Sequence, residues 1–125
     1  MRRQMLLVVL SIIFLASNAE AEGKKNGNTA KVSSERTTLV SWYNHGKVTA
    51  NGERFSPNGL TVAHKHLPFG TIVKFTNPEN NKVVFARVND RGPYIKGREF
   101  DLTARCASIL GMKDKGVVRL KVQIL

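Results

Sequence analysis

The stretch that decides the fold is KVVFARVNDRGP, residues 82–93, an apolar run that ends in a polar turn. Its β-branched residues, bounded by Gly92 and Pro93, are typical of a strand. Asp90 closes the strand. If the strand's alternation continues to its end, Asp90 lies on the same side as Val84, Ala86 and Val88. We therefore expect its carboxyl group at the rim of an apolar face.

Further segments of the same character lie on both sides of this strand. Residues 38–43, 60–63, 71–76 and 118–124 are rich in β-branched and aromatic residues, and turn formers separate them. The loop at 77–81 is typical of a hairpin. In the last segment, Val118, Leu120, Val122 and Ile124 alternate with largely polar residues, which predicts a strand with one buried face.

One short helix is predicted directly after residue 103. Thr103 can cap it, Ala104 and Ala107 begin its buried stripe, and Gly111 suits the left-handed position after its end. Several short strands, one helix and no internal repeat favour a small, closed all-β barrel.

The N-terminal third of the chain has a different composition. Residues 1–21 combine a cationic start, an apolar run and small residues at Ala19 and Ala21, which is typical of a secretory signal peptide. A retained membrane anchor is the alternative, but its apolar run falls short of the roughly 20 residues that a spanning helix needs. Residues 22–36 are polar and predict a flexible basic linker. Residues 37–125 then form one small domain.

The charge and the cysteine content restrict the possible environments. A formal net charge of +11 favours polyanionic surroundings, namely nucleic acid, anionic lipid or cell-wall carboxylates. Export and the lack of a nucleic-acid motif argue against nucleic acid. Cys106 is the only cysteine, so no internal disulfide and no lipid attachment near the cleavage site are expected. We expect Cys106 to be a small buried side chain of the helix.

Three polar residues at the borders of strand-like runs are candidates for chemistry. Asp90 at an apolar rim has the setting of a general acid. Glu53, after the turn signal Asn51-Gly52, can share a proton, activate a hydroxyl or stabilise an oxocarbenium ion beside it. His64 ends the run 60–63. The alternatives are a turn-forming Asp and a solvated Glu.

A metal site is the other possibility raised by these residues, because His64 and His66 are two residues apart. No ligand pair has the spacing of a helical metal site, and Cys106 is remote in sequence, so we expect no metal. The sequence also has no dinucleotide fingerprint and no phosphate-binding loop. We therefore expect no cofactor.

Three motifs in one order, TANGERF at 49–55, AHKHLPFG at 63–70 and VNDRGP at 88–93, resemble the rare lipoprotein A family of bacterial envelope proteins, which includes septal lytic transglycosylases. The resemblance covers residues 37–124. It implies a mainly β fold, the six-stranded double-psi β-barrel shared with barwin-like proteins and the first domain of expansins, with one or two short helices.

The resemblance also implies a function. Such a protein is exported to the periplasm or cell envelope, here without a lipid, and acts as a monomer on peptidoglycan glycan strands. It cleaves the bond between N-acetylmuramic acid and N-acetylglucosamine without water and leaves a 1,6-anhydro-muramyl end. A non-catalytic, expansin-like module that binds or loosens the wall is the alternative.

The family's site residues match particular positions of this chain. Asp90 matches the catalytic acid/base, and Glu53 and His64 match the other polar residues of the site. Aromatic and polar neighbours are expected to bind the sugar: Tyr94, Arg91, Trp42 and Asn51. The segment 43–49 is shorter than the family's usual stretch, which would reshape one wall of the groove.

Overall fold

The computed structural model describes residues 32–125 of the 125-residue chain, so the predicted signal peptide and most of the predicted linker lie outside it. Within that range the chain forms six strands and one helix. They are β1 (Arg36–Tyr43), β2 (Thr61–Ala63), β3 (Ile72–Thr76), β4 (Val83–Asp90), β5 (Phe100–Thr103), α2 (Ala104–Ile109) and β6 (Val118–Ile124). None of the described helices is both long and apolar enough to cross a membrane.

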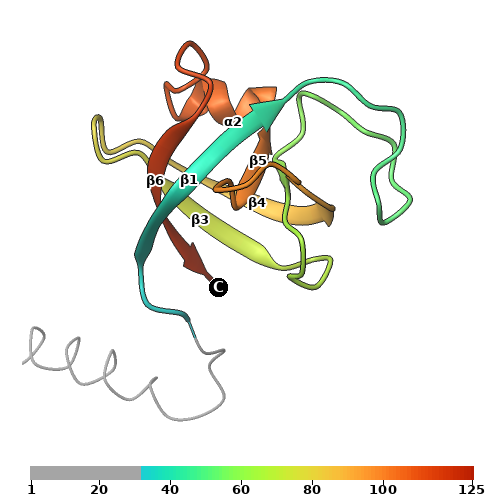
Figure 1. Ribbon diagram of the computed structural model, residues 1–125, viewed down its shortest axis with the longest axis horizontal. Helices are drawn as coiled ribbons and strands as arrows, with labels where there is room; N and C mark the ends of the chain where they lie inside the picture. The colour runs from blue at the N-terminus through green and yellow to red at the C-terminus, as the bar shows by residue number, and fades with distance from the viewer. Residues whose placement is uncertain (1–31) are drawn as a thin grey trace, which may run out of the picture. The chain divides into compact units, whose positions relative to one another are not determined.

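The six strands close into one barrel, in the order β1-β5-β2-β4-β3-β6 (Figure 1). Two pairs are parallel, β1 with β5 and β2 with β4, and the other four pairs are antiparallel. Every strand therefore has two neighbours, and the barrel has no open edge. This confirms the predicted six-stranded barrel.

Alternating side chains of the strands fill the barrel with apolar groups. Phe75, Phe100 and Leu102 are fully buried, and Leu120 and Val122 of β6 point inward with them. Arg119 and Lys121 of β6 are exposed, as the alternation in the sequence predicts. Burial of these side chains at roughly 25 cal/mol per Å² is the main stabilising contribution, and it holds the strand ends that carry the polar residues.

The helix follows the sequence prediction closely. Thr103 is its N-cap, and the Thr103 hydroxyl accepts a hydrogen bond from the Cys106 backbone N–H. Cys106 is buried, as expected. Gly111 has φ +70°, the left-handed conformation that ends helices and that glycine adopts without a steric penalty.

The sequence analysis missed β5. This strand is only four residues long, contains a half-buried Asp101, and runs directly into the helix without a turn. It nevertheless lies between β1 and β2 and closes the barrel. Its register pairs Asp101 with Ser41 of β1 and with Ala63 of β2.

The end of β4 departs from the simple alternation. The β2–β4 register shifts by one residue there, because Val62 is opposite Val88 whereas Ala63 is opposite Asp90. Asn89 is the extra residue of this bulge. A bulge bends its strand and redirects the side chains at its end. Asn89 is buried and Asp90 is half-buried, so the pattern that buries Val84, Ala86 and Val88 does not extend to Asp90.

The hydrogen bonds of the barrel begin at Ser33, a few residues before the predicted start of the domain at residue 37. Ser33 exchanges hydrogen bonds with β6: its N–H donates to the Ile124 carbonyl at 3.0 Å, and its hydroxyl accepts from the Ile124 N–H at 2.8 Å. These bonds join the start of the described chain to the last strand.

Candidate functional site

Asp90 is held at the end of β4 by three hydrogen-bond donors. The Tyr43 hydroxyl donates to Oδ2 at 2.9 Å, and the backbone N–H groups of Ala50 and Arg91 each donate to Oδ1 at 2.9 Å. These donors come from β1, from the 44–55 loop and from the turn after β4. A carboxylate accepts all three bonds. The side chain is therefore fixed in position by three separate segments.

Tyr43 keeps its proton in this arrangement. Burial, and then the hydrogen bond to Asp90, raise the pKa of Tyr43 above its usual range. The ring stacks on Phe55 with centroids 4.9 Å apart. The phenol is thus a permanent donor to Asp90, and the stack packs the loop that contains Phe55 onto β1.

Glu53 lies in a second, ionic cluster beside Asp90. Arg87 of β4 binds its carboxylate with both guanidinium nitrogens, at 2.7 and 3.0 Å, and the amides of Asn89 and Asn51 donate at 3.0 Å each. The bonds from Arg87 first, and then from the two amides, lower the pKa of Glu53 to about 2. Glu53 is therefore ionised at neutral pH, with a side chain that remains 40% exposed.

Adjacent residues connect the two carboxylates into one network. Ala50 binds Asp90 while its neighbour Asn51 binds Glu53. On β4, Asn89 binds Glu53, and the next residue of the strand is Asp90 itself. The Asn51 N–H also donates to the Asn89 carbonyl at 3.2 Å. The structure thus brings Asp90, Glu53 and Asn51 together at one end of the barrel.

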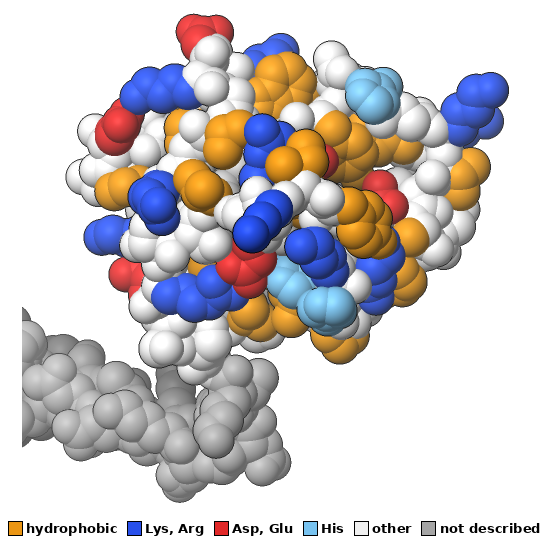
Figure 2. Space-filling model, viewed as in Figure 1, with side chains coloured by type: hydrophobic (Ala, Val, Ile, Leu, Met, Phe, Trp, Pro, Cys, Tyr) orange, Lys and Arg blue, Asp and Glu red, His pale blue; other side chains and the backbone are white. Residues whose placement is uncertain are grey.

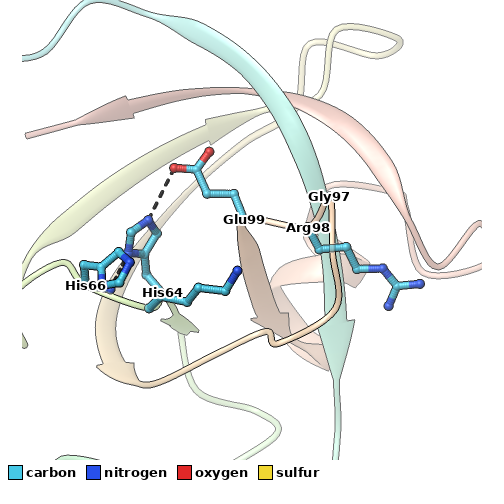
Figure 3. Close-up of a pocket in the computed structure, with 6 residues that line it drawn as sticks. His64, His66, Gly97, Arg98 and Glu99 are labelled. Atoms are coloured by element: carbon cyan, nitrogen blue, oxygen red, sulfur yellow. Dashed lines mark hydrogen bonds and ion pairs between the residues drawn. The ribbon is translucent and has the colours of Figure 1, made fainter.

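The His64 backbone contacts Asp90, but its ring lies in a different set of contacts. The His64 N–H donates to the Asp90 carbonyl at 3.2 Å. Ring atom Nδ1 accepts from the backbone N–H groups of His66 and Leu67 at 3.0 Å, and Nε2 lies 3.3 Å from Glu99 (Figure 3). Since Nδ1 accepts, the proton is on Nε2 and points to Glu99. Burial lowers the pKa of His64, against the opposing effect of Glu99.

Glu99 completes this second set of contacts. Arg36 of β1 binds its carboxylate with both guanidinium nitrogens, and these bonds are the main reason that the pKa of Glu99 is lowered to about 2. Beside it lies a cavity of about 340 Å³. Its lining residues are His64, Lys65, His66, Gly97, Arg98 and Glu99 (Figure 3). The charged groups that line it are Lys65, Arg98 and Glu99, and Glu99 is paired with Arg36.

The remaining sequence-predicted residues have distinct surroundings. Arg91 donates to the carbonyls of His64 and Leu67, at 3.1 and 2.8 Å, and its guanidinium lies 3.9 Å from the centre of the Phe69 ring. Trp42 packs against the core and donates to the Lys113 carbonyl at 3.1 Å. Tyr94, in contrast, is 77% exposed in the turn after Asp90.

Sequence reasoning missed several residues of the site. Nothing in the local sequence indicated that Arg87 would pair with Glu53 or that the Tyr43 hydroxyl would donate to Asp90. Asp101 belongs to the missed strand β5; it accepts a bond from the Ser41 hydroxyl at 2.9 Å. The only available signal was the FDLT sequence at 100–103, an Asp between two large apolar residues that pack inward.

The surface and the possible metal ligands complete the description. Basic side chains are spread over the viewed face rather than gathered in one patch (Figure 2). Within residues 32–125, no three His, Cys, Asp or Glu side chains converge as metal ligands would.

Comparison with known proteins places this barrel in a family. The family described as lytic transglycolase matches residues 35–122. Proteins named endolytic peptidoglycan transglycosylase RlpA are similar to the chain: that of Rickettsia felis is 42% identical over 117 residues, covering 89% of this chain and 51% of the relative. That of Rickettsia prowazekii is 47% identical over 95 residues, covering 71% and 30%. The chain thus spans about half or less of the length of these relatives.

Solved structures show the same barrel at low sequence identity. A Streptomyces papain inhibitor superimposes with a TM-score of 0.63 at 18% identity, over 75% of this chain and 96% of that one. Cerato-platanin 3 from M. perniciosa gives 0.56 at 13% identity, over 72% and 94%. At these identities the likeness concerns the fold alone. The family match, the identity to the RlpA proteins and the closed six-stranded barrel together show that the chain belongs to the RlpA-like lytic transglycolase family of double-psi β-barrels.

Proposed function

We propose that this barrel is an exported lytic transglycosylase that cleaves peptidoglycan glycan strands between N-acetylmuramic acid and N-acetylglucosamine. The observation that carries the proposal is the 42% identity, over 89% of the chain, to a protein named endolytic peptidoglycan transglycosylase. The network around Asp90 and Glu53 supports it, because paired carboxyl groups are the usual means of breaking a glycosidic bond.

The proposed reaction consumes no water. A carboxyl group donates a proton to the glycosidic oxygen, the bond from that oxygen to muramyl C1 breaks, and its electron pair stays on the oxygen. The muramyl C6 hydroxyl oxygen then bonds to C1 and gives its proton to a carboxylate. The products are a free 4-hydroxyl on N-acetylglucosamine and a 1,6-anhydro-muramyl end. One carboxyl group can serve both transfers, and Asp90 is the residue that the sequence predicts for them.

The surroundings of each residue suggest its role. Asp90 is fixed by three donors and is the carboxylate that takes the C6 proton. Glu53 holds Asn51, whose neighbour Ala50 binds Asp90, so we propose that Glu53 acts by positioning Asp90. His64 and Arg91 support the turn beside Asp90 in the same way. Tyr94, exposed in that turn, is the proposed stacking surface for a sugar ring.

Location and partners follow from this activity. We propose that residues 1–21 are removed on export, that the residues from 22 up to the first barrel contact at Ser33 act as a linker, and that the unlipidated monomer works in the periplasm or cell envelope on glycan strands. Intact-mass analysis of protein released from the periplasm tests the cleavage: we expect a chain that begins at residue 20 or 22. A mass that still includes residues 1–16 would contradict it.

The activity itself is tested by mass spectrometry of the products from purified peptidoglycan. A lytic transglycosylase gives fragments with a 1,6-anhydro end, one water lighter than hydrolytic fragments. Fragments with ordinary reducing ends would indicate a hydrolase instead. No fragments, together with sedimentation of the protein with insoluble peptidoglycan, would indicate the non-catalytic wall-binding module.

A further inference from the structure

A second aspartate lies next to Asp90 on the same face of the barrel. Ala63 of β2 is paired with Asp90 of β4 on one side and with Asp101 of β5 on the other. Residues opposite each other in neighbouring strands present their side chains on one face. Because strands are about 4.8 Å apart, the two Cα atoms are separated by two spacings, about 10 Å. Ala63, the residue between them, has only a methyl side chain.

A Cα separation of this size allows two Asp side chains on one face to bring their carboxyl groups to one bound sugar. Carboxyl pairs that act on a single glycosidic bond lie roughly 5 to 9.5 Å apart. The charge of Asp90 acts on Asp101, and both carboxylates act on the Tyr43 phenol. Asp90, Asp101 and Tyr43 therefore form one electrostatic unit across β4, β5 and β1.

The two aspartates differ in how their carboxyl groups are bonded. Among residues 32–125, three donors bond to the Asp90 carboxyl group, whereas one, the Ser41 hydroxyl, bonds to that of Asp101. Asp101 is also half-buried. Fewer donors to the charged form favour the neutral acid over the carboxylate. The pair is thus unequal, and Asp101 is the member whose surroundings favour keeping a proton.

We propose that Asp101 is a further catalytic residue: its carboxyl group donates the proton to the glycosidic oxygen, while Asp90 accepts the proton of the C6 hydroxyl. This division rests on the proposed transglycosylase function. The cycle moves one proton from Asp101 to Asp90, and exchange with solvent water restores the starting state. No water is consumed and no oxidation state changes.

The titration behaviour of Asp101 agrees with this role. Burial first, and then the charge of Asp90, raise the pKa of Asp101, while the Ser41 hydroxyl, Arg98 and His45 oppose the increase. A donor with a raised pKa stays protonated to higher pH than an ordinary Asp. The rate of the wild-type chain is therefore expected to fall as the pH rises through the pKa of Asp101.

The first test does not depend on activity. In the full chain, the carboxyl carbon of Asp101 is followed by NMR as the pH is changed. We expect Asp101 to titrate above the ordinary Asp range. Asp90→Asn should lower that pKa because it removes the neighbouring negative charge, and Ser41→Ala should raise it because it removes a donor to the carboxylate. An ordinary pKa that neither substitution moves would overturn the proposal.

The second test measures catalysis and binding separately. Asp101→Asn keeps the size of the side chain and its bond to Ser41, yet it has no proton to donate. We expect a loss of about 10² to 10⁴ in fragment release with normal sedimentation on insoluble peptidoglycan and an unchanged unfolding temperature. Ser41→Ala should move the alkaline limb of the rate profile to higher pH, which a merely structural role of Asp101 would not produce.

The results of these experiments distinguish a failure of the Asp101 role from a failure of the proposed transglycosylase function. Full turnover by Asp101→Asn, with 1,6-anhydro fragments still formed, would overturn the role of Asp101 and leave the transglycosylase intact. If the wild-type chain forms no anhydro fragments, the proposed function fails, and the donor role of Asp101 fails with it. In that case, the NMR titration still decides whether the two aspartates form the unequal pair.

Discussion

The two ends of β4 use similar residues for different purposes. The strand begins after the hairpin loop NPENN at 77–81 and ends in NDRGP at 89–93, and both turns contain Asn, an acid and Pro. At the first end, the Asn side chains bind backbone: Asn77 and Asn80 both donate to the Leu110 carbonyl, at 2.8 and 3.1 Å. At the second end, two carboxyl groups lie at the centre: Asp90 accepts from the Tyr43 hydroxyl and two backbone N–H groups, and Glu53 accepts from Arg87 and two amides.

This difference separates folding from chemistry. An amide that bonds a helix end fixes the backbone and has no proton to transfer, whereas a carboxyl group fixed by donors retains an acid–base function. Composition alone does not reveal which role a polar turn has. The partners decide it, and they come from strands far away in sequence.

The largest expected effect is a loss of turnover caused by a substitution of Asp90, at the C-terminal end of β4. Asp90→Asn keeps the size of the side chain but removes its ability to accept a proton, so we expect fragment release from peptidoglycan to fall by about 10² to 10⁴. Binding to insoluble peptidoglycan and the thermal unfolding midpoint should change little. Retained turnover in this variant would show that Asp90 is a turn former like the Asn residues at the other end.

A smaller loss is expected from Glu53→Gln. The glutamine cannot form the ion pair with Arg87, so the loop that carries Ala50 and Asn51 loses its anchor to β4 and the donor to Asp90 is less well placed. A misplacement of about 1 Å costs up to roughly 100-fold in rate, and we expect a loss of about 10- to 100-fold.

The matched control for this variant is Glu79→Gln, which removes another exposed carboxylate that is paired with a cation, Lys115. It lies in the hairpin loop at the other end of β4, and its turnover should equal that of the wild type. Equal losses in the two variants would show that removing a surface charge, rather than the contacts of Glu53, affects activity.

A substitution in the hairpin loop before β4 should have the opposite result, a loss of stability with normal turnover. Asn77 is buried, donates to the Leu110 carbonyl and accepts from the Glu79 N–H at 3.0 Å. Asn77→Ala removes both bonds, so the Leu110 carbonyl keeps only the Asn80 amide and the Glu79 N–H loses its acceptor, at a cost of about 1 kcal/mol. In a domain of this size, we expect the midpoint of thermal unfolding to fall by roughly 4–8 °C per kcal/mol, with normal turnover well below the midpoint. A loss of turnover at low temperature would contradict the separation of the two ends.

The fold was largely predictable because most of its elements are locally encoded. The alternation in β6, the cap at Thr103 and the hairpin before β4 each depend on neighbouring residues, and the structure confirms them. β5 was not predictable from local pattern, because its four residues form a strand only between β1 and β2. The bulge at Asn89 has the same origin, since it exists only in the register with β2.

The site was predictable in part for a related reason. The motifs gave Asp90, Glu53 and His64 by resemblance, and their individual roles remain proposals. The pairing of Glu53 with Arg87 and the proximity of Asp101 to Asp90 depend on the barrel's strand order. Residue spacing along the chain contains no information about that order. Charge partners across strands are therefore the part of a site that a single sequence reveals least.

The smallest expected effect concerns the contribution of Glu53 to the stability of the fold at low pH. The folded pKa of Glu53 is about 2, below its ordinary value of 4.5, mainly because of Arg87. A lowered carboxyl pKa stabilises the fold fully above pH 4.5, and this contribution is lost as the pH falls toward 2. Urea unfolding of the wild type and Glu53→Gln should therefore differ slightly at pH 6 and converge near pH 2. A difference that stays constant between pH 6 and pH 2 would show that Glu53 stabilises the loop through packing rather than charge.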